Sequence, residues 1–277
     1  MPTPLPRYAV IDKKIGETPL QALERYRADS GIAKEVPLAY AGRLDPLASG
    51  TLLILIGDEC KNQTAYHKLD KVYQFSVLFG VSSDTYDPLG RLAFCHPPPI
   101  EISTLRQICH NLQGTITLPY PPFSAKTVNG KPLHTWTLEG RLSEIAIPVQ
   151  TSKVYRLQLK KMRYMTAADI YKDALSRIDS IQKVTDPKKA LGADFRRADV
   201  CADWEVFLKT HGEEMFPIAD LHCIASSGTY MRSLAQHLGE QLNVPALAFS
   251  IHRSKIGRYQ KLLGHWGIFT RQFRHHS

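Results

Sequence analysis

An aspartate held between two glycines is the residue of this sequence best placed to do chemistry. Asp45 stands in the segment Gly42-Arg43-Leu44-Asp45-Pro46-Leu47-Ala48-Ser49-Gly50, which leads into the apolar stretch from Thr51 to Ile56. Glycines and a proline restrict the backbone on both sides, so a rigid turn would project the carboxylate at the mouth of a strand. Such a carboxylate can act as a nucleophile or a base. The same residue could also merely close an Asx turn, and its immediate surroundings leave both interpretations open.

Strands and helices surround this turn and must position it. Patterns typical of strands cover residues 8–12, 51–56, 72–79, 153–161 and 221–225. Helical spacing covers 19–27 and 102–112, and it returns after the turn Ser226-Ser227-Gly228. Because these elements mix without a regular βαβ alternation, the sequence predicts an α+β fold. The basic tail from Arg271 to His276 is expected to be frayed.

Residues 164–215 differ in character from the rest of the chain because they are rich in charge and helical in pattern. Thr166-Ala167-Ala168-Asp169 matches a capping box, which marks the start of a helix. The apolar residues that follow at near-helical intervals are Ile170, Ala174, Ile178 and Ile181. We therefore expect a helical insertion at about 164–215 within a single domain that spans 1–277.

Composition excludes several classes of protein. Apolar residues make up 43% of the 277 residues and charged residues 22%, which excludes wholesale disorder. Apolar runs are far shorter than a membrane span, and no secretory signal is apparent, so we expect a cytoplasmic protein without a membrane partner. Five scattered cysteines without a C-x-x-C pair support neither a disulfide framework nor a metal site. The net charge of +9 admits nucleic acid as a partner, although no helix-turn-helix or zinc pattern indicates DNA.

Four ordered segments resemble motifs of the bacterial tRNA pseudouridine synthase B family. The first segment comprises the family's central G-H-T-G-x-L-D-P-L-A-T-G, similar to residues 39–50, and the G-E-A-T-K that follows it, similar to residues 57–61. The K-x-Y motif matches Lys71-Val72-Tyr73. The P-P-x-Y-S-A-x-K-x-x-G-K-x-L segment is similar to residues 121–133, and C-S-x-G-T-Y-I-R-x-L-x-x-x-L-G is similar to residues 225–239.

The resemblance implies an RNA uridine isomerase that needs no cofactor and no metal. It also implies a mixed, largely antiparallel sheet of the pseudouridine synthase type with flanking helices. The family flips a uridine out of the RNA, breaks the bond from C1′ to N1 and rejoins the uracil through C5. Its target is uridine 55 in the T loop of tRNA.

The resemblance assigns roles to particular residues. Asp45 matches the catalytic aspartate, and whether it acts as nucleophile or base stays open. Arg232 matches the family's basic residue, whose guanidinium can pair with the carboxylate through two hydrogen bonds and keep it ionised. Tyr73 matches the tyrosine that packs against the flipped base and is a candidate for handling the C5 proton. The residues expected to bind substrate are Tyr40, Tyr73, Tyr230 and Ile251.

The sequence also departs from the family pattern. Tyr40 replaces the motif histidine, Lys14 replaces a usual proline, and Lys126 stands one residue earlier than the family lysine. The insertion at 164–215 has no recognised counterpart, and we expect no PUA-type RNA-binding domain. The candidate phosphate contacts are Lys14, Lys61, Lys126 and Arg253, together with Lys188, Lys189, Arg196 and Arg197 of the insertion.

The sequence as a whole therefore predicts a monomeric pseudouridine synthase that acts on the T arm of tRNA. Two alternatives remain. Tyr40 and the insertion could redirect the same chemistry to another RNA stem-loop. The chain could instead be a non-catalytic RNA-binding or RNA-folding protein on the same scaffold, although the joint presence of Asp45, Tyr73 and Arg232 argues against that interpretation.

Overall fold

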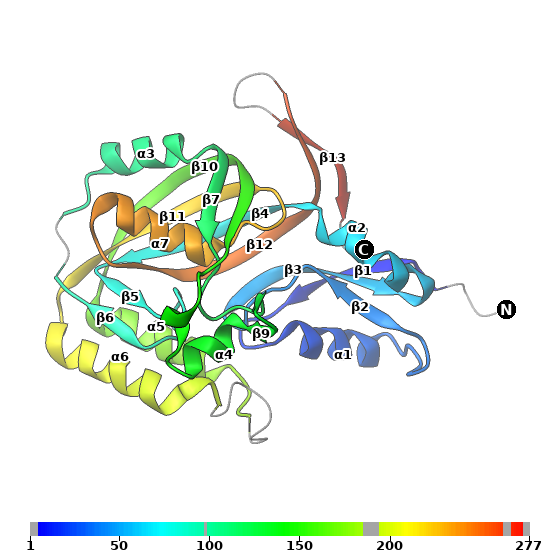
Figure 1. The fold of residues 1–277 in the computed structure, drawn as a ribbon, viewed down its shortest axis with the longest axis horizontal. Coiled ribbons are helices and arrows are strands. Elements are labelled where there is room, and N and C mark those ends of the chain that lie inside the picture. Colours follow the sequence, from blue (N-terminus) through cyan, green and yellow to red (C-terminus); the bar gives the residue numbers. More distant parts are fainter. Residues whose placement is uncertain (1–4, 97–98, 185–193, 263–266, 274–277) are drawn as a thin grey trace.

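A nine-stranded sheet forms the centre of the computed structural model, which describes residues 5–96, 99–184, 194–262 and 267–273 (Figure 1). The strand order is β1-β3-β12-β4-β11-β10-β7, with β13 paired to β12 and β2 paired to β3. Within the described residues its pairings are antiparallel, apart from a parallel contact of β3 with β12. The strands of this sheet are β1 (Tyr8–Lys13), β2 (Leu38–Ala41), β3 (Ala48–Ile56), β4 (Asp70–Phe79), β7 (Gly114–Pro119), β10 (Val149–Thr166), β11 (Met215–Ala225), β12 (Ala246–Lys261) and β13 (Gly267–Phe273).

Helices and short hairpins connect these strands, so the predicted α+β fold with a mixed, largely antiparallel sheet is confirmed. The helices are α1 (Pro19–Asp29), α2 (Gln63–His67), α3 (Ile102–Asn111), α4 (Leu133–Leu138), α5 (Ala167–Asp179), α6 (Arg197–His211) and α7 (Met231–Leu242), with 3₁₀ turns η1 (Gly57–Asn62), η2 (Leu142–Glu144) and η4 (Asp194–Arg196). The short strands β5 (Val81–Ser83) and β6 (Leu92–Phe94) form one hairpin, and β8 (Thr127–Val128) and β9 (Lys131–Pro132) form another. Across the described ranges, no helix is both long enough and apolar enough to cross a bilayer.

Two helical layers cover opposite faces of the sheet because successive residues of a strand point to opposite sides. Val77 of β4 belongs to the core beneath α3 and α7, where it is buried with Leu105 and Leu234. The next residue, Leu78, belongs to a second core that contains Ile170 of α5 and other residues of α5 and α6. Figure 1 shows α3 and α7 away from α5 and α6, with the sheet between the two pairs.

The predicted insertion is helical, but its helical part is shorter than expected. Thr166 accepts a hydrogen bond from the Asp169 backbone at the start of α5, as the capping pattern predicts. The strand ladder between β10 and β11 continues to the pair Thr166 and Met215, so residues 164–166 and 215 belong to strands rather than to the insertion. The helices α5 and α6 therefore project from the end of a long hairpin.

The carboxyl-terminal segment also differs from the sequence prediction. Residues 271–273 are not frayed but lie in β13, where Arg271 is the register partner of Arg258 and Phe273 that of Ile256. Phe273 is buried against Tyr8 and Tyr66, and this apolar contact holds the strand in place. The rest of the expected frayed tail, residues 274–276, lies outside the described residues.

Candidate active site

A cavity of about 630 Å³ opens where the Asp45 loop, β4, β12 and the start of α7 meet. Five of the residues singled out in the sequence line it together, although they are far apart in the chain. These residues are Asp45, Tyr73, Tyr230, Arg232 and Ile251. The described residues contain no group of three or more histidine, cysteine or acidic side chains arranged to hold a metal ion.

Two glycines and two buried leucines shape the loop that carries Asp45. Gly42 and Gly50 have φ values of +81° and +102°, in the left-handed region that favours glycine. A Cβ atom on Gly50 would lie 2.3 Å from the Arg253 carbonyl oxygen, so there is no space for a side chain. Leu44 and Leu47 are buried on either side of Asp45 and anchor the loop to the protein. The carboxylate is thus projected from a fixed backbone.

Two buried cations, Lys13 and Arg253, bind backbone carbonyls of the same loop. Lys13 Nζ donates hydrogen bonds to the carbonyls of Lys14 (2.9 Å), Pro46 (3.2 Å) and Ala48 (2.6 Å). Burial lowers the pKa of Lys13 from 10.5 to about 8. The Arg253 guanidinium donates to the carbonyls of Thr51 (2.8 Å), Arg43 (3.2 Å) and Gly42 (3.0 Å). Both side chains therefore act on Asp45 through the backbone around it.

Arg232 pairs with Asp45 through two parallel hydrogen bonds. The Nε atom lies 2.8 Å from Oδ2 and the Nη2 atom lies 3.0 Å from Oδ1. The arginine side chain is 6% exposed, whereas the aspartate side chain is 41% exposed. Burial lowers the pKa of Arg232, but the charges of Asp45 and Asp87 outweigh that effect and raise it overall. The pair thus presents an oriented carboxylate to the cavity, backed by a fixed cation.

The rest of the Arg232 guanidinium is held by two other loops. Nη1 donates to the Thr85 carbonyl (2.8 Å), and both Nη atoms approach the Phe123 carbonyl at 3.3–3.4 Å. Asp87 Oδ2 lies 3.8 Å from Nε. Burial raises the pKa of Asp87, although the charge of Arg232 acts in the opposite direction. Asp45 and Asp87 therefore flank one arginine from two different parts of the chain.

Aromatic rings form the walls of the cavity. Tyr120 and Tyr230 pack with ring centroids 5.2 Å apart, and Lys126 Nζ lies 5.3 Å from the Tyr120 ring. Tyr73 is buried on the floor, and this burial raises the pKa of its hydroxyl, so the side chain is a neutral phenol. Flat aromatic surfaces beside an anion are suited to a nucleobase that has left its stack.

The structure does not bring every candidate residue to this cavity. Tyr40 is absent from the described cavity lining and packs with the apolar cluster of α1 and β3. Lys14 is exposed elsewhere, and Lys61 is exposed on η1 in an ion pair with Asp58. Lys126 lies at the cavity and is exposed.

The prediction that Arg253 contacts an RNA phosphate is not supported by its position in the structure, because the side chain is buried. Its side chain is 1% exposed, and three backbone carbonyls occupy the guanidinium. The register of β12 places this position inward, so the cation supports the loop rather than facing solvent.

The basic residues of the insertion are also engaged within the protein. Arg196 forms an ion pair with Asp84, and Arg197 forms one with Asp194. Both arginines, which the sequence suggested as RNA phosphate contacts, are therefore paired with carboxylates of the protein itself. Lys188 and Lys189 lie outside the described residues.

Sequence reasoning missed several residues that shape the site. Thr85 and Asp87 stand in a segment whose pattern indicates only a turn, and nothing local predicts their contact with Arg232. Lys13 carried a detectable signal, because it follows Ala9 and Ile11 at intervals of two and so shares their buried face of β1. The Phe123 contact is made by a backbone carbonyl, which side-chain identity does not predict.

This chain is similar in sequence to known proteins over more than half of its length. Residues 32–172 match the family model described as TruB family pseudouridylate synthase (N terminal domain). A tRNA pseudouridine synthase B from Bordetella avium (strain 197N) is 26% identical over 259 residues, which cover 92% of this chain and 83% of that protein. Its namesake from Aquifex aeolicus (strain VF5) is 31% identical over 150 residues, 54% of this chain and 50% of that protein. The latter match thus spans half the length of the relative.

Among solved structures, a chain of the "Crystal Structure of a Cbf5-Nop10-Gar1 Complex" has a similar fold. The TM-score is 0.52 with 16% sequence identity, and the match covers 91% of this chain and 49% of the other. At that identity the likeness concerns the fold alone.

Proposed function

Because this chain belongs to the TruB family of pseudouridylate synthases, we propose that it converts uridine to pseudouridine in RNA. The reaction is an isomerisation. The bond from C1′ to N1 breaks, a bond from C1′ to C5 forms, the C5 proton leaves and N1 gains a proton. The side chains that line the cavity can supply an anion near the sugar, aromatic surfaces for the base and a phenol beside it.

The observation that carries this proposal is the Asp45–Arg232 ion pair at the wall of an aromatic cavity. Two hydrogen bonds from the buried guanidinium orient the carboxylate. The Asp45 anion starts the reaction either by attack on C1′ or by removal of a sugar proton. Arg232 keeps that anion aimed while the aromatic walls hold the extruded uracil.

We place Tyr73 against the flipped uracil, with Tyr230 and Ile251 as further walls of its site. The neutral phenol of Tyr73 can donate a hydrogen bond to the base, and its ring supplies stacking surface. Lys126, exposed at the cavity, is positioned to contact a phosphate of the flanking RNA. These assignments describe how the chain's own groups bind and orient a nucleotide.

We further propose that the substrate is the T arm of tRNA, with uridine 55 as the target. The names of the matched relatives support this choice, since both are tRNA pseudouridine synthases B. Mapping pseudouridine in cellular RNA with and without this protein tests it. Loss of the modification at uridine 55 is the expected result. Loss at a different stem-loop would keep the chemistry but replace the substrate.

An assay on the purified protein tests the chemistry itself. Wild-type protein is expected to release tritium from C5-labelled uridine in a T-arm stem-loop. Asp45→Asn should release none and still bind the RNA, because the amide preserves shape but supplies no anion. Asp58→Asn is the matched control, since that carboxylate is exposed on η1. Binding without turnover by the wild type would favour the non-catalytic alternative.

A further inference from the structure

One turn separates the insertion from the candidate active site. It comprises residues 83–91, between β5 and β6. On its inner side the Thr85 carbonyl and the Asp87 carboxylate face Arg232, at 2.8 Å and 3.8 Å. Ser83 Oγ donates to the Asp87 carbonyl (2.6 Å), and Thr85 Oγ1 donates to Asp87 Oδ1 (2.8 Å). The turn is therefore a compact unit that holds two acceptors around one guanidinium.

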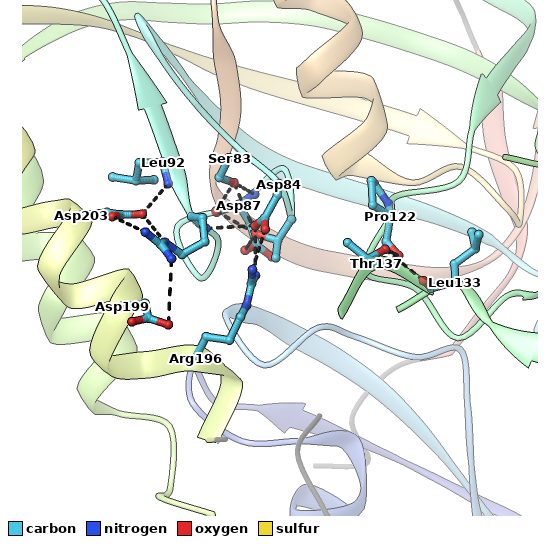
Figure 2. Close-up of polar contacts among 12 residues, drawn as sticks. Ser83, Asp84, Asp87, Leu92, Pro122, Leu133, Thr137, Arg196, Asp199 and Asp203 are labelled. Atoms are coloured by element: carbon cyan, nitrogen blue, oxygen red, sulfur yellow. Dashed lines mark hydrogen bonds and ion pairs between the residues drawn. The ribbon is translucent and has the colours of Figure 1, made fainter. Parts of the chain in front are cut away.

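Three residues of the insertion contact the outer side of this turn. Arg196 binds both Asp84 oxygens, at 2.6 Å and 3.0 Å. Asp203 of α6 accepts from Arg91 Nε (2.7 Å) and Nη2 (3.1 Å) and from the Leu92 backbone N–H (3.0 Å). Trp204 is fully buried and donates to the Pro88 carbonyl (3.0 Å). Figure 2 shows Arg196 and Asp203 approaching the turn from the insertion, with Asp87 on the same turn.

Arg196 also contacts the second loop that holds Arg232. Its guanidinium carbon lies 4.4 Å from the centroid of the Phe123 ring, and the Phe123 carbonyl accepts from Arg232. Thr137 of α4 also contacts this loop, by donating to the carbonyl of the preceding residue, Pro122 (3.1 Å; Figure 2). Arg196 thus contacts both loops that complete the coordination of Arg232.

The backbone at this point is unusual. Asp194, Phe195 and Arg196 have successive φ values of 45°, 61° and 56°, in the left-handed region that non-glycine residues rarely occupy. Such residues are strained, and clusters of them persist where surrounding contacts over-determine the geometry. Here the contacts are the ion pair to Asp84 and the packing on Phe123. The conformation delivers the Arg196 side chain to the turn.

We propose that Arg196 is a positioning residue for the isomerisation, through which the insertion holds Arg232, and hence Asp45, in working geometry. This inference rests on the proposed function. Arg196 touches neither member of the Asp45–Arg232 pair by hydrogen bond among the described contacts, so it acts through Asp84 and Phe123. A loosened turn would shift the Thr85 and Asp87 acceptors. The Arg232 guanidinium would then be held less firmly, and so would the Asp45 carboxylate that it orients.

Arg177 provides a matched control within the same insertion. It binds Asp173 through two hydrogen bonds of 3.0 Å and lies 5.4 Å over the Phe249 ring. Its side chain is 19% exposed, against 20% for Arg196. Arg177→Ala therefore removes the same kinds of contact, but none of them is made to the turn or to Phe123.

Steady-state kinetics on a T-arm stem-loop separates positioning from RNA binding. For Arg196→Ala we expect kcat to fall about tenfold or more with little change in KM. Arg196→Lys should recover part of that loss, since it keeps the charge but not the two-bond fork. Arg177→Ala should retain wild-type kcat at a similar loss of stability. If Arg196→Ala instead raises KM and lowers the salt dependence of binding at unchanged kcat, Arg196 is an RNA contact and the inference is wrong.

A measurement on the free protein keeps this inference separate from the proposed function. The ¹⁵N–¹H resonance of Arg232 Nε, identified by its loss in Arg232→Lys, reports on the bond to Asp45. We expect it to shift or broaden in Arg196→Ala and to stay in place in Arg177→Ala. An unmoved resonance would overturn the inference whether or not the protein is active. Wild-type protein that modifies no RNA would overturn the proposed function alone.

Discussion

At the scale of the residue, the Asp45–Arg232 pair joins an accessible anion to a buried cation. The guanidinium is fully enclosed by Asp45, Asp87 and two backbone carbonyls. A buried charge that loses its partners is strongly destabilising, so these four groups favour the observed position of Arg232. Asp45 keeps part of its surface open to the cavity. A bound molecule could therefore contact the exposed part of the Asp45 carboxylate while Arg232 keeps its position.

Arg232→Lys should nearly abolish turnover while RNA binding persists. A lysine retains the charge but offers a single ammonium, which cannot make the parallel bonds to Asp45 and reach the Thr85 carbonyl as well. We expect kcat to fall roughly 100-fold or more. Tritium release and a binding titration measure the two effects. Arg106→Lys, on the exposed face of α3, is the control. A kcat close to that of the wild type would show that the two-bond geometry is dispensable.

A second prediction at this scale concerns the pH dependence of stability through Lys13. Its pKa is about 8 in the folded protein and 10.5 ordinarily, so the unfolded chain binds more protons between these values. The contribution of Lys13 to the free energy of unfolding should therefore rise with pH across that interval and be lowest below pH 8. The wild type should gain roughly 1 kcal/mol per pH unit relative to Lys13→Met.

Urea unfolding of the wild type and Lys13→Met at several pH values measures this difference. Lys34→Met, at an exposed lysine, should track the wild type throughout. A difference between wild type and Lys13→Met that does not vary with pH would mean that Lys13 keeps its ordinary pKa.

At the scale of the element, the Asp45 loop depends on close approach of β3 to β12. The two strands run parallel here, with Gly50 as the register partner of Arg253. The Arg253 side chain then turns back to the carbonyls of Gly42 and Arg43 at the start of the loop. One residue of β12 thus contacts both ends of the loop. This arrangement needs a position without a side chain at Gly50.

Gly50→Ala should destabilise the protein by about 2 kcal/mol or more. The new Cβ would meet the Arg253 carbonyl oxygen at 2.3 Å, and the φ of +102° would add strain. Gly31→Ala separates the two causes, because Gly31 has a φ of +62° and a Cβ added there would meet nothing within 4 Å. The control should cost about 1 kcal/mol. Equal midpoints in chemical denaturation for the two variants would argue against the steric account.

At the scale of the whole molecule, the chain has a net charge of +9, but several of its arginines form ion pairs or hydrogen bonds within the protein. Arg232, Arg253 and Arg196 are engaged with protein atoms, so in the proposed function other cations would contact RNA phosphates, among them exposed lysines such as Lys126. Counterions released by such lysines make RNA binding depend on salt. If the proposed function holds, RNA binding and the chemistry at Asp45 therefore depend on different cations.

Lys126→Ala should weaken binding of a T-arm stem-loop and lower the slope of log affinity against log salt by about 0.7–1. Its ammonium lies at the cavity beside Tyr120. Lys61→Ala should leave the slope unchanged, because that ammonium pairs with Asp58 at 2.6 Å on η1 and lies apart from the cavity lining. Titrations at several salt concentrations measure both slopes. Equal slopes for Lys126→Ala and wild type would remove Lys126 from the RNA contacts.

Local signals in the sequence predicted local structure well. The strand expected at 8–12 is β1, and the capping pattern at Thr166 marks the start of α5. The resemblance to the family also implied that Arg232 pairs with Asp45, as the structure shows, and their functional roles stay predictions. Contacts of the 83–91 turn were not predictable, because they depend on how α6 packs against a hairpin more than a hundred residues away in the chain. Pairing of Arg253 with backbone carbonyls likewise carries no sequence signature.

The paired ends of the insertion have a consequence for how the chain folds. Thr166 and Met215 are register partners, so β10 and β11 can pair fully only when the long segment between them closes into a loop. Closing it as a random coil costs about 2 kcal/mol more than closing a tight turn. Early formation of α5 and α6 shortens the effective loop and so reduces the entropic cost of closing it. We therefore expect the two helices of the insertion also to influence how quickly the β10–β11 hairpin nucleates.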